Sequence, residues 1–445
     1  MGRYFGTDGF RGEVGKELTA DHAFYIGCFL GTYFRSDRRS RFLIGKDTRL
    51  SSDTLEYALA AGLTATGADA YLLHTIPTPG VSYLTRAGDF DGGIMISASH
   101  NPYGDNGIKL FGKNGAKMAD AAIEALEKWL DGSRKPQFST GKGIGTVMDH
   151  GAARTTYGAR LISTAPSLCG LRVGIDAANG AAWHLAGQIF TALGATVHVI
   201  HNTPNGVNIN DGCGSTHTAE LQRLVNEQGL DVGFAFDGDA DRCIAVDEHG
   251  CVVDGDDILY VMAKAMQARG ELAQNTVVTT VMSNLGLHRG LECLGIHTVR
   301  TAVGDRFVYE RMQQEHYVLG GEQSGHIIFG ALADTGDGIL TALQLAGVLC
   351  DKGCALSDLT AGFVRYPQLL WNVSVRDKKA AAADAVVLQA VAEVERELGD
   401  AGRVLVRASG TEPVVRVMVE AETEERCRDC AERVARRLRE RGHSV

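Results

Sequence analysis

The sequence predicts an α/β protein in which three units are built on mixed, mainly parallel sheets and a smaller α+β unit follows them. A short apolar run, a polar turn, a helix, a glycine and a second apolar run recur three times along the chain, and this order is typical of parallel βαβ units. The length of 445 residues corresponds to roughly three domains at about 150 residues each. The 55 glycines and only 8 prolines indicate many tight loops between regular elements.

The first repeat begins with a predicted strand at Arg41–Gly45, continues with a helix at about Ser52–Thr66 and ends with a strand at Ala70–Leu73. The other two repeats show the same order of strand, helix and strand, at Arg172–Ile175, Trp183–Leu193, Thr196–Ile200, Thr276–Val281, 283–294 and His297–Thr301. Their wide spacing favours separate units over the alternative of one large doubly wound sheet. The composition of Asp131–Gly145 is typical of a linker and favours separate units too.

The end of the chain differs from the three repeats. Trp371–Val375 and Val414–Val419 alternate in the way that strands with one exposed face do. Ala380–Leu398 and Glu424–Arg439 are amphipathic and rich in Ala, Glu and Arg, which predicts two helices. We therefore expect a separate α+β unit of roughly 80 residues, at the small end for a domain.

Charge and composition exclude several classes of protein. With 44 Lys and Arg against 54 Asp and Glu, the net charge is −10, and no basic block indicates a nucleic-acid partner. The most apolar early stretch, Ala23–Phe34, is too short to span a bilayer. The first residues lack the apolar core of a secretory signal, so we expect neither a membrane nor a nucleic-acid partner.

The ten cysteines are mostly scattered singly through apolar runs. Scattered thiols without a disulfide framework indicate a reducing compartment, so we expect a cytoplasmic protein. A four-cysteine zinc site formed by Cys350, Cys354, Cys427 and Cys430 is the less favoured alternative. The second of these pairs lies in a charged helical pattern that lacks the glycine-containing turn typical of such sites.

Three carboxylates at alternate positions, Asp237, Asp239 and Asp241, directly follow the apolar strand Val232–Phe236. Such a cluster repels itself unless a cation lies among its members, so we favour a Mg²⁺ site. A solvated acidic turn is the bland alternative, and strand-like flanks disfavour an EF-hand fragment. Arg242 comes directly after the cluster and indicates an anionic partner.

A second polar turn follows the predicted strand at Ile94–Ile96 and contains Ser97 and Ser99. Ligands bind beyond the carboxyl ends of strands in open α/β sheets, so these hydroxyls lie where chemistry is expected. Lys109 supplies a cation shortly afterwards. A serine beside a histidine is weak evidence for a nucleophile by itself. An esterase has little support, because no Gly-x-Ser-x-Gly elbow is present.

Two further loops combine glycine with polar side chains. Gly320–His326 lets the backbone approach a polyhydroxylated ligand that Glu322 and Ser324 could reach, although a simple glycine-rich hairpin is an equal alternative. Arg407–Pro413 combines a guanidinium, two hydroxyls and a glycine, which can form a nest for a phosphate. Together the four loops predict a cation site, a nucleophile, a sugar site and a phosphate site.

These four segments, in this order and at these separations, resemble the α-D-phosphohexomutase superfamily. The match runs from Phe5–Gly12 to Arg407–Pro413 and so covers essentially the whole chain. The resemblance implies three domains with a shared α/β core and a fourth α+β domain around a central cleft. We place the four domains at residues 1–150, 151–252, 253–366 and 367–445.

The resemblance also implies roles for individual residues. Ser99 would be phosphorylated in the active enzyme and, with Asp237, Asp239 and Asp241, would hold one Mg²⁺ per chain. Charge on the transferred phosphoryl group would be stabilised by Arg11, Lys109 and Arg242, and the general base would be Lys109 or His326. The residues in contact with the substrate would be Glu322, Ser324 and His326 on the sugar, and Arg407, Ser409, Gly410 and Thr411 on its non-reacting phosphate.

Within the superfamily, Gln323 resembles the branch that acts on glucosamine phosphates, since other branches more often carry Met there. The resemblance implies interconversion of glucosamine 6-phosphate and glucosamine 1-phosphate through a 1,6-bisphosphate, on the route to UDP-N-acetylglucosamine and cell-wall precursors. A hexosamine or hexose 1,6-bisphosphate could prime Ser99. Three alternatives stay open: a mutase for glucose or mannose phosphates, a phosphatase, and a non-catalytic sensor. The sequence also leaves open whether the chain forms a homodimer.

Overall fold

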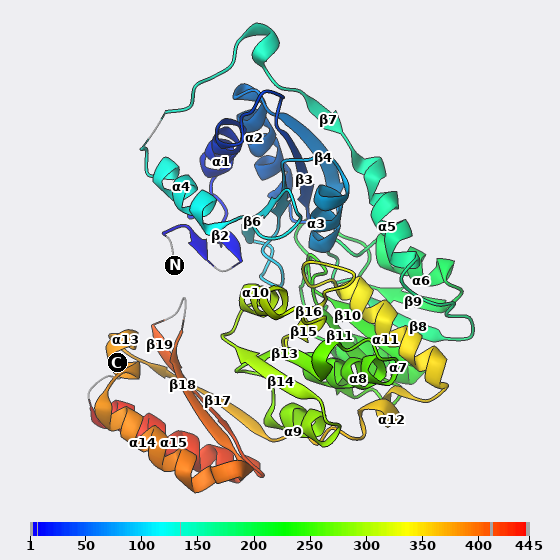
Figure 1. Cartoon of the computed structure of the whole chain (residues 1–445), viewed down its shortest axis with the longest axis vertical. Helices are drawn as coiled ribbons and strands as arrows, with labels where there is room; N and C mark the ends of the chain where they lie inside the picture. The colour runs from blue at the N-terminus through cyan, green and yellow to red at the C-terminus, as the bar shows by residue number, and fades with distance from the viewer. Residues whose placement is uncertain (1–2, 7, 134, 410–412, 442–445) are drawn as a thin grey trace. The chain divides into compact units, whose positions relative to one another are not determined.

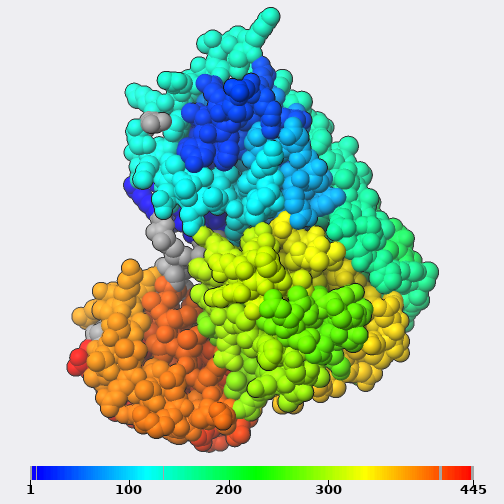
Figure 2. Space-filling model, viewed as in Figure 1, coloured from blue at the N-terminus to red at the C-terminus, as the bar shows by residue number. Residues whose placement is uncertain are grey.

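The computed structural model describes all residues except 1–2, 7, 134, 410–412 and 442–445 (Figure 1). The chain forms two compact units. The first contains residues 1–282 and 296–361, and the second contains residues 283–295 and 362–445. In the space-filling view, the described residues of 362–445 in the smaller unit run from yellow-orange to red (Figure 2).

The first sheet of the larger unit has the strand order β1-β2-β6-β5-β3-β4-β7. Strand β3 is parallel to both β4 and β5, whereas β5 and β6 form an antiparallel pair. Helices α1, α2 and α4 share one apolar core with this sheet (Figure 1). The elements are β1 (Phe5–Gly6), β2 (Gly9–Glu13), α1 (Ala20–Tyr33), β3 (Arg41–Lys46), α2 (Ser52–Ala65), β4 (Asp69–Thr75), α3 (Thr78–Ala87), β5 (Gly92–Ile96), β6 (Asp105–Gly112), α4 (Asp120–Leu130) and β7 (Val147–Asp149).

The second sheet has the order β12-β11-β10-β8-β9. Strand β8 is parallel to β9 and to β10, and β10 forms an antiparallel hairpin with β11. The turn of that hairpin carries Asp237, Asp239 and Asp241 and is called the acidic turn below. The elements are α5 (Arg154–Ile162), β8 (Arg172–Asp176), α6 (Leu185–Ala192), β9 (Thr196–Ile200), α7 (Ala219–Gln228), β10 (Val232–Phe236), β11 (Cys243–Asp247) and β12 (Val252–Val253).

The third sheet has the order β14-β13-β15-β16, with β13 parallel to its neighbours β14 and β15. Helix α11 follows this sheet in sequence but contacts β10 and β11 of the second sheet. The elements are α8 (Gly255–Ala268), β13 (Thr276–Thr280), β14 (His297–Thr301), α10 (Asp305–Glu315), β15 (Leu319–Gly321), β16 (Ile327–Phe329), α11 (Gly338–Lys352) and α12 (Leu356–Thr360).

The smaller unit has one antiparallel sheet of order β17-β19-β18 and includes α9 (Leu285–Cys293), which lies between β13 and β14 in sequence. Glu420 is fully buried and joins α9 to this sheet. Its carboxylate accepts hydrogen bonds from Leu285 N at 3.0 Å and from Gln368 Nε2 at 2.8 Å, and it pairs with Arg403. The remaining elements are β17 (Gln368–Ser374), α13 (Lys378–Ala382), α14 (Ala385–Leu398), β18 (Arg403–Ala408), β19 (Val414–Glu420) and α15 (Glu424–Glu440).

The predicted fold class is confirmed: three mixed α/β sheets precede a smaller α+β part. One predicted helix, Ala380–Leu398, is instead two helices. Asp384 separates them because its carboxylate accepts from Val386 N at 2.8 Å and thereby caps a new helix. The described part of Asp131–Gly145 is irregular apart from a short turn at Gly141–Gly143. None of the described helices combines the length and apolar character that crossing a bilayer requires.

Candidate active site

Ser99 lies just beyond the carboxyl end of β5 and is fully buried. Its backbone has φ of +53°, a left-handed conformation that is uncommon for a residue with a side chain. Ser99 N donates to Ser97 Oγ at 2.9 Å, and Ser99 O accepts from Asn210 Nδ2 at 2.9 Å. These bonds hold the turn so that the Ser99 hydroxyl donates to the carboxylate of Asp237.

The turn between β10 and β11 brings the three predicted aspartates together. Asp237, Asp239 and Asp241 are all buried, and their ligand atoms lie within 4.8 Å of one another. The Oδ1 atoms of Asp239 and Asp241 have no hydrogen-bond partner among the described residues. Buried carboxylate oxygens are rarely left without partners, so these residues fit a hard divalent cation such as Mg²⁺, which prefers oxygen ligands.

The electrostatics of the turn fit a cation site. Burial, followed by the charges of Asp241 and Asp239, raises the pKa of Asp237 well above its ordinary value. Burial and the charge of Asp241 also raise the pKa of Asp239. For Asp241, the opposing effect of burial is outweighed by Lys109, His326 and Arg242, so its pKa is lowered.

Two cationic side chains lie at the acidic turn. Lys109, on β6, is buried, and its Nζ lies 2.8 Å from Asp239 Oδ2 and 3.1 Å from Asp241 Oδ2. Arg242 donates from Nη1 to His100 Nδ1 at 3.1 Å, and His100 in turn contacts the Ser99 hydroxyl. Burial, followed by the charge of Arg242, lowers the pKa of His100 to about 4, so its ring is neutral and accepts that bond.

A chain of charged side chains continues from Lys109 towards α10. Asp8 pairs with Lys109 and Arg11 on one side and with Lys117 on the other. Lys117 then reaches Asp305, the first residue of α10, at 2.7 Å. A cavity of about 450 Å³ opens beside this chain, with Asp8, Lys109, Lys117 and Arg306 in a lining that also contains apolar side chains.

His326 lies at the end of this chain and is buried. Its Nε2 is 3.7 Å from Asp305 Oδ2, and neither ring nitrogen has a hydrogen-bond partner among the described residues. The ring packs over Gly336, where an added Cβ would lie 2.5 Å from it. His326 is therefore held in place by packing while its nitrogens stay available to a ligand.

The loop between β15 and β16 presents Glu322 and Ser324. Glu322 Oε1 accepts from Gly304 N at 3.0 Å, and Ser324 is exposed. Gln323 turns to α8 instead, where its Nε2 donates to Asp254 Oδ2 at 3.1 Å. Asp254 is the N-cap of α8 and accepts from Asp256 N at 3.0 Å, so Gln323 ties the loop to a capped helix end.

The predicted phosphate loop belongs to the smaller unit. Arg407 is half-buried near the end of β18, and burial, followed by the charge of Arg416, lowers its pKa. Ser409 is buried and donates its N–H to Val414 O at 2.9 Å. Gly410 and Thr411 lie outside the described residues.

The sequence did not single out three residues that the structure places at the site. Asp8 links Lys109 to Lys117. Thr78 donates to Asp239 through its hydroxyl, and its N–H donates to Asp239 O at 3.0 Å. Asn210 holds Ser99 O. Thr78 follows the predicted strand of the first repeat within a few residues, and that position beyond a strand end is the signal that could have found it.

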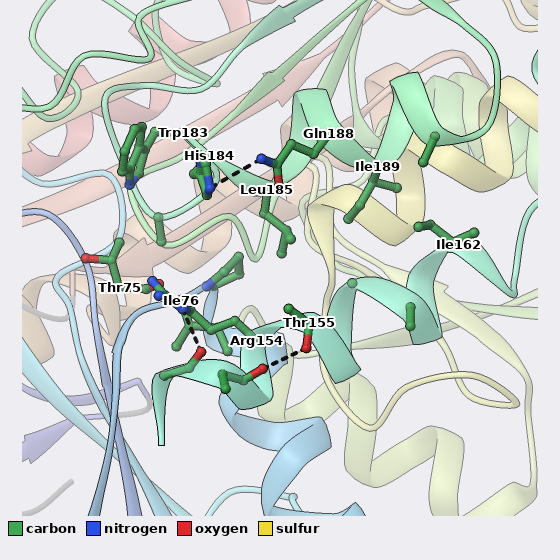
Figure 3. A pocket seen from close by; sticks show the side chains of 17 residues that line it. Thr75, Ile76, Arg154, Thr155, Ile162, Trp183, His184, Leu185, Gln188 and Ile189 are labelled. Carbon is green, nitrogen blue, oxygen red and sulfur yellow. Dashed lines mark hydrogen bonds between the residues drawn. The ribbon is translucent and has the colours of Figure 1, made fainter. Parts of the chain in front are cut away.

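An apolar cavity of about 460 Å³ lies apart from these charges, between α5, α6 and the segment after β4 (Figure 3). Trp183, Leu185, Ile189 and Ile162 supply much of its wall, with Arg154 at one edge (Figure 3). Arg154 donates to the carbonyl of Gly151 at 2.9 Å and so serves the local backbone. This cavity contains none of the predicted site residues.

Comparison with known proteins gives the same picture along the whole chain. The models for phosphoglucomutase/phosphomannomutase alpha/beta/alpha domains I, II and III match residues 2–136, 155–250 and 254–366. The model for the C-terminal domain of that family matches residues 370–437.

Relatives of similar length share about half of their residues with this chain. The phosphoglucosamine mutase of Lachnoclostridium phytofermentans is 54% identical over 445 residues, which cover 100% of this chain and 99% of the relative. That of Geobacillus kaustophilus is 50% identical over 440 residues, covering 98% of both chains.

Solved structures share the fold. A phosphoglucomutase/phosphomannomutase family protein from Burkholderia thailandensis matches with a TM-score of 0.81 at 25% identity, covering 99% of this chain and 98% of that one. The N-acetylphosphoglucosamine mutase of Aspergillus fumigatus, solved with GlcNAc-6P and magnesium, has a TM-score of 0.66 at 18% identity, with coverage of 99% and 96%. The chain therefore belongs to the phosphoglucosamine mutase family, a branch of the phosphoglucomutases and phosphomannomutases.

Proposed function

We propose that this protein interconverts glucosamine 6-phosphate and glucosamine 1-phosphate through a phosphorylated Ser99 and a 1,6-bisphosphate. The hydrogen bond from the buried Ser99 hydroxyl to Asp237 carries the proposal, because it joins the nucleophile to an all-oxygen cation site. Relatives named phosphoglucosamine mutase are 50% and 54% identical to this chain in sequence, which supports the choice of sugar.

Asp237, Asp239 and Asp241, together with the phosphate on Ser99, would hold Mg²⁺. When bound, the ion neutralises charge that builds up on the phosphoryl oxygens during transfer. Lys109 and Arg242 flank the same turn and add fixed positive charge, and Arg11 reaches the group through the Asp8 network. Positioning and charge neutralisation are most of what phosphoryl transfer requires of a protein.

In the first half-reaction, the bond between Ser99 Oγ and phosphorus breaks while a bond from phosphorus to O1 of glucosamine 6-phosphate forms. The O1 proton passes to a base, and the departing Ser99 Oγ takes up a proton to restore its hydroxyl. His326 is the better of the two predicted candidates for the base. Lys109 is unsuited, because the carboxylates of Asp239, Asp241 and Asp8 outweigh burial and hold its pKa well above the ordinary value. Lys109 therefore stays protonated and acts as a fixed charge.

In the second half-reaction, the bisphosphate presents its 6-phosphate to Ser99, which takes the phosphoryl group back and releases glucosamine 1-phosphate. Glu322 and Ser324 would accept either orientation of the sugar. Arg407, Ser409, Gly410 and Thr411 would bind whichever phosphate is not reacting. A hexose or hexosamine 1,6-bisphosphate would restore any Ser99 that had lost its phosphate.

All ten cysteines are free thiols, which supports a place in the cytoplasm. There the product would feed the synthesis of UDP-N-acetylglucosamine and cell-wall precursors.

The test is turnover of glucosamine 6-phosphate with Mg²⁺ and a trace of hexose 1,6-bisphosphate, with glucose 1-phosphate and mannose 1-phosphate in parallel. We expect a strong preference for the amino sugar and loss of turnover in Ser99→Ala. Ser133→Ala, which alters an exposed serine, is the control. Full turnover by Ser99→Ala would refute the mechanism. Release of inorganic phosphate at the turnover rate would indicate a phosphatase, and binding without turnover a sensor.

A further inference from the structure

A second set of metal-ligating side chains lies in the second sheet of the larger unit, apart from the acidic turn. Asp176, His201 and Cys213 each offer one ligand atom, and these atoms lie within 4.8 Å of one another. Asp176 ends β8 and His201 directly follows β9. Because β8 and β9 are parallel neighbours, with Asp176 opposite Ile200, the two side chains emerge at the same sheet edge. Cys213 reaches them from the loop before α7.

Neighbouring groups fix the orientation of the Asp176 carboxylate. Its Oδ1 accepts from Ala178 N and its Oδ2 accepts from Gly214 N, both at 2.9 Å. Asp176 and Cys213 are fully buried, whereas the side chain of His201 keeps 21% of its surface exposed. The set is thus preorganised and has one open side through which an ion can enter.

The two nitrogens of His201 face different partners. Nδ1 points at the set, 3.0 Å from Asp176 Oδ1, and Nε2 lies 2.9 Å from Glu220 Oε2 in the first turn of α7. A carboxylate on the far nitrogen of a metal-binding histidine is the usual arrangement, because it fixes the tautomer that leaves the near nitrogen free to bind. Glu220 occupies that place here.

We propose that Asp176, His201 and Cys213 bind a transition-metal cation of the Zn²⁺ type. The donor set decides the class of ion: a thiolate, an imidazole and a single carboxylate suit Zn²⁺, whereas Mg²⁺ prefers the three carboxylates of the acidic turn. Ligand atoms at about 2.0–2.3 Å from one Zn²⁺ lie about 3–4 Å apart, and the three ligand atoms here lie within 4.8 Å of one another. Three protein ligands leave a fourth position for water.

A proton is the competing occupant of the site. A protonated His201 would bridge Asp176 and Glu220, and the hydrogen bond to Asp176 does raise the pKa of His201. That arrangement, however, leaves the Cys213 thiol without any role in it. Burial raises the pKa of Cys213 to about 12, so without a metal this sulfur stays a thiol. A thiolate signal from Cys213 would therefore report the metal.

The proposed metal site is linked to the turn that contains Ser99 through the loop of Asn210. Asn210, three residues before Cys213, donates from its N–H to Ala178 O at 3.0 Å and from its side chain to Ser99 O. Gly214, directly after Cys213, is held by Asp176. A metal at this position would fasten the loop of Asn210 to the end of β8, so we expect it to raise the melting temperature.

The experiment is a Co²⁺ titration of the full-length, metal-stripped protein with Mg²⁺ in excess to occupy the acidic turn. Co²⁺ reports coordination by sulfur through a thiolate-to-metal charge-transfer absorption. We expect this band to saturate at one equivalent, to vanish in Cys213→Ser, and to bleach when Zn²⁺ displaces Co²⁺. The control is Cys169→Ser, which removes an exposed thiol and should keep the band.

Glu220→Gln provides a second variant, because its side chain is half exposed and its replacement should leave the fold intact. It should keep the band but weaken Co²⁺ binding by about 10-fold or more, the usual effect of losing such a partner. Circular dichroism verifies that each variant folds. Absence of the band in the wild-type protein, or a band that survives in Cys213→Ser, would overturn the proposal. Neither result bears on the mutase reaction, which is assayed separately.

Discussion

The Nζ atom of Lys109 lies 2.8 Å from Asp239 Oδ2, and both side chains are buried. Lys109 also pairs with Asp8 and Asp241, so one buried cation compensates three carboxylates from two different sheets. It supplies positive charge at the acidic turn.

Replacing Lys109 with Met should therefore destabilise the protein as well as abolish turnover. Removing one partner of a buried ion pair leaves the other charge uncompensated. This lowers the free energy of unfolding by about 3–5 kcal/mol. Urea denaturation followed by circular dichroism measures the change, and added Mg²⁺ should recover part of it. Lys113→Met, at an exposed position just after β6, is the control. Equal denaturation midpoints for wild type and Lys109→Met would contradict this account.

Binding of Mg²⁺ should release protons. Burial and like charges raise the pKa values of Asp237 and Asp239, so these carboxyls hold protons to a higher pH than usual, and the ion must displace any proton bound there. Affinity for Mg²⁺ should consequently weaken as the pH falls. Calorimetric titration in two buffers with different ionisation enthalpies measures the proton count. Identical heats in both buffers would show that the aspartates are already ionised.

Gln323→Met should narrow the preference for the amino sugar. The change removes the hydrogen bond from Gln323 Nε2 to Asp254, and with it one restraint on the backbone that presents Glu322 and Ser324. A single neutral hydrogen bond contributes about 1 kcal/mol, so we expect the kcat/KM ratio of glucosamine to glucose phosphates to fall by up to about tenfold. Gln188→Met, on the exposed side of α6, is the matched control. An unchanged ratio would assign the specificity elsewhere.

Asp337 should make stability depend on pH in a defined direction. It caps α11 and accepts from the Tyr157 hydroxyl at 2.8 Å, and burial raises its pKa from 3.8 to about 6. Because the folded protein holds this proton more tightly than the unfolded chain, its stabilising contribution is complete below about pH 4 and is lost as the pH rises through 6.

The neutral variant Asp337→Asn removes that dependence. Between pH 4 and pH 7, the melting temperature of the variant should rise relative to that of the wild type. Differential scanning calorimetry at several pH values measures this difference. A constant difference across this range would contradict a pKa near 6 for Asp337 in the folded protein.

Much of the fold could be predicted because each strand and helix is a local pattern. Ser99 and the aspartates at 237, 239 and 241 could be singled out for the same reason, since each directly follows an apolar strand. Asp8 and Thr78 could not, because Lys109 and Lys117 lie about 100 residues from Asp8 in sequence, and Asp239 meets Thr78 only when two sheets dock. The break at Asp384 was missed because a capping residue inside an alanine-rich run resembles a surface position.

The direction of Gln323 shows a related limit. In sequence it lies between two predicted sugar-contacting residues, Glu322 and Ser324, but its side chain turns away to the cap of α8. Rotamer choice depends on which partner lies within reach, and Asp254 becomes a partner only once α8 and the loop are in place.

The burial of Glu420 against the start of α9 has a consequence for the order in which the chain is made. The ribosome delivers α9 well before β17, and β19, which carries Glu420, comes last of the three strands. The amide of Leu285 must wait for that carboxylate. In a nascent chain that has completed the third sheet, the first amide of α9 therefore still lacks its partner. That partner, the Glu420 carboxylate, emerges only near the end of translation.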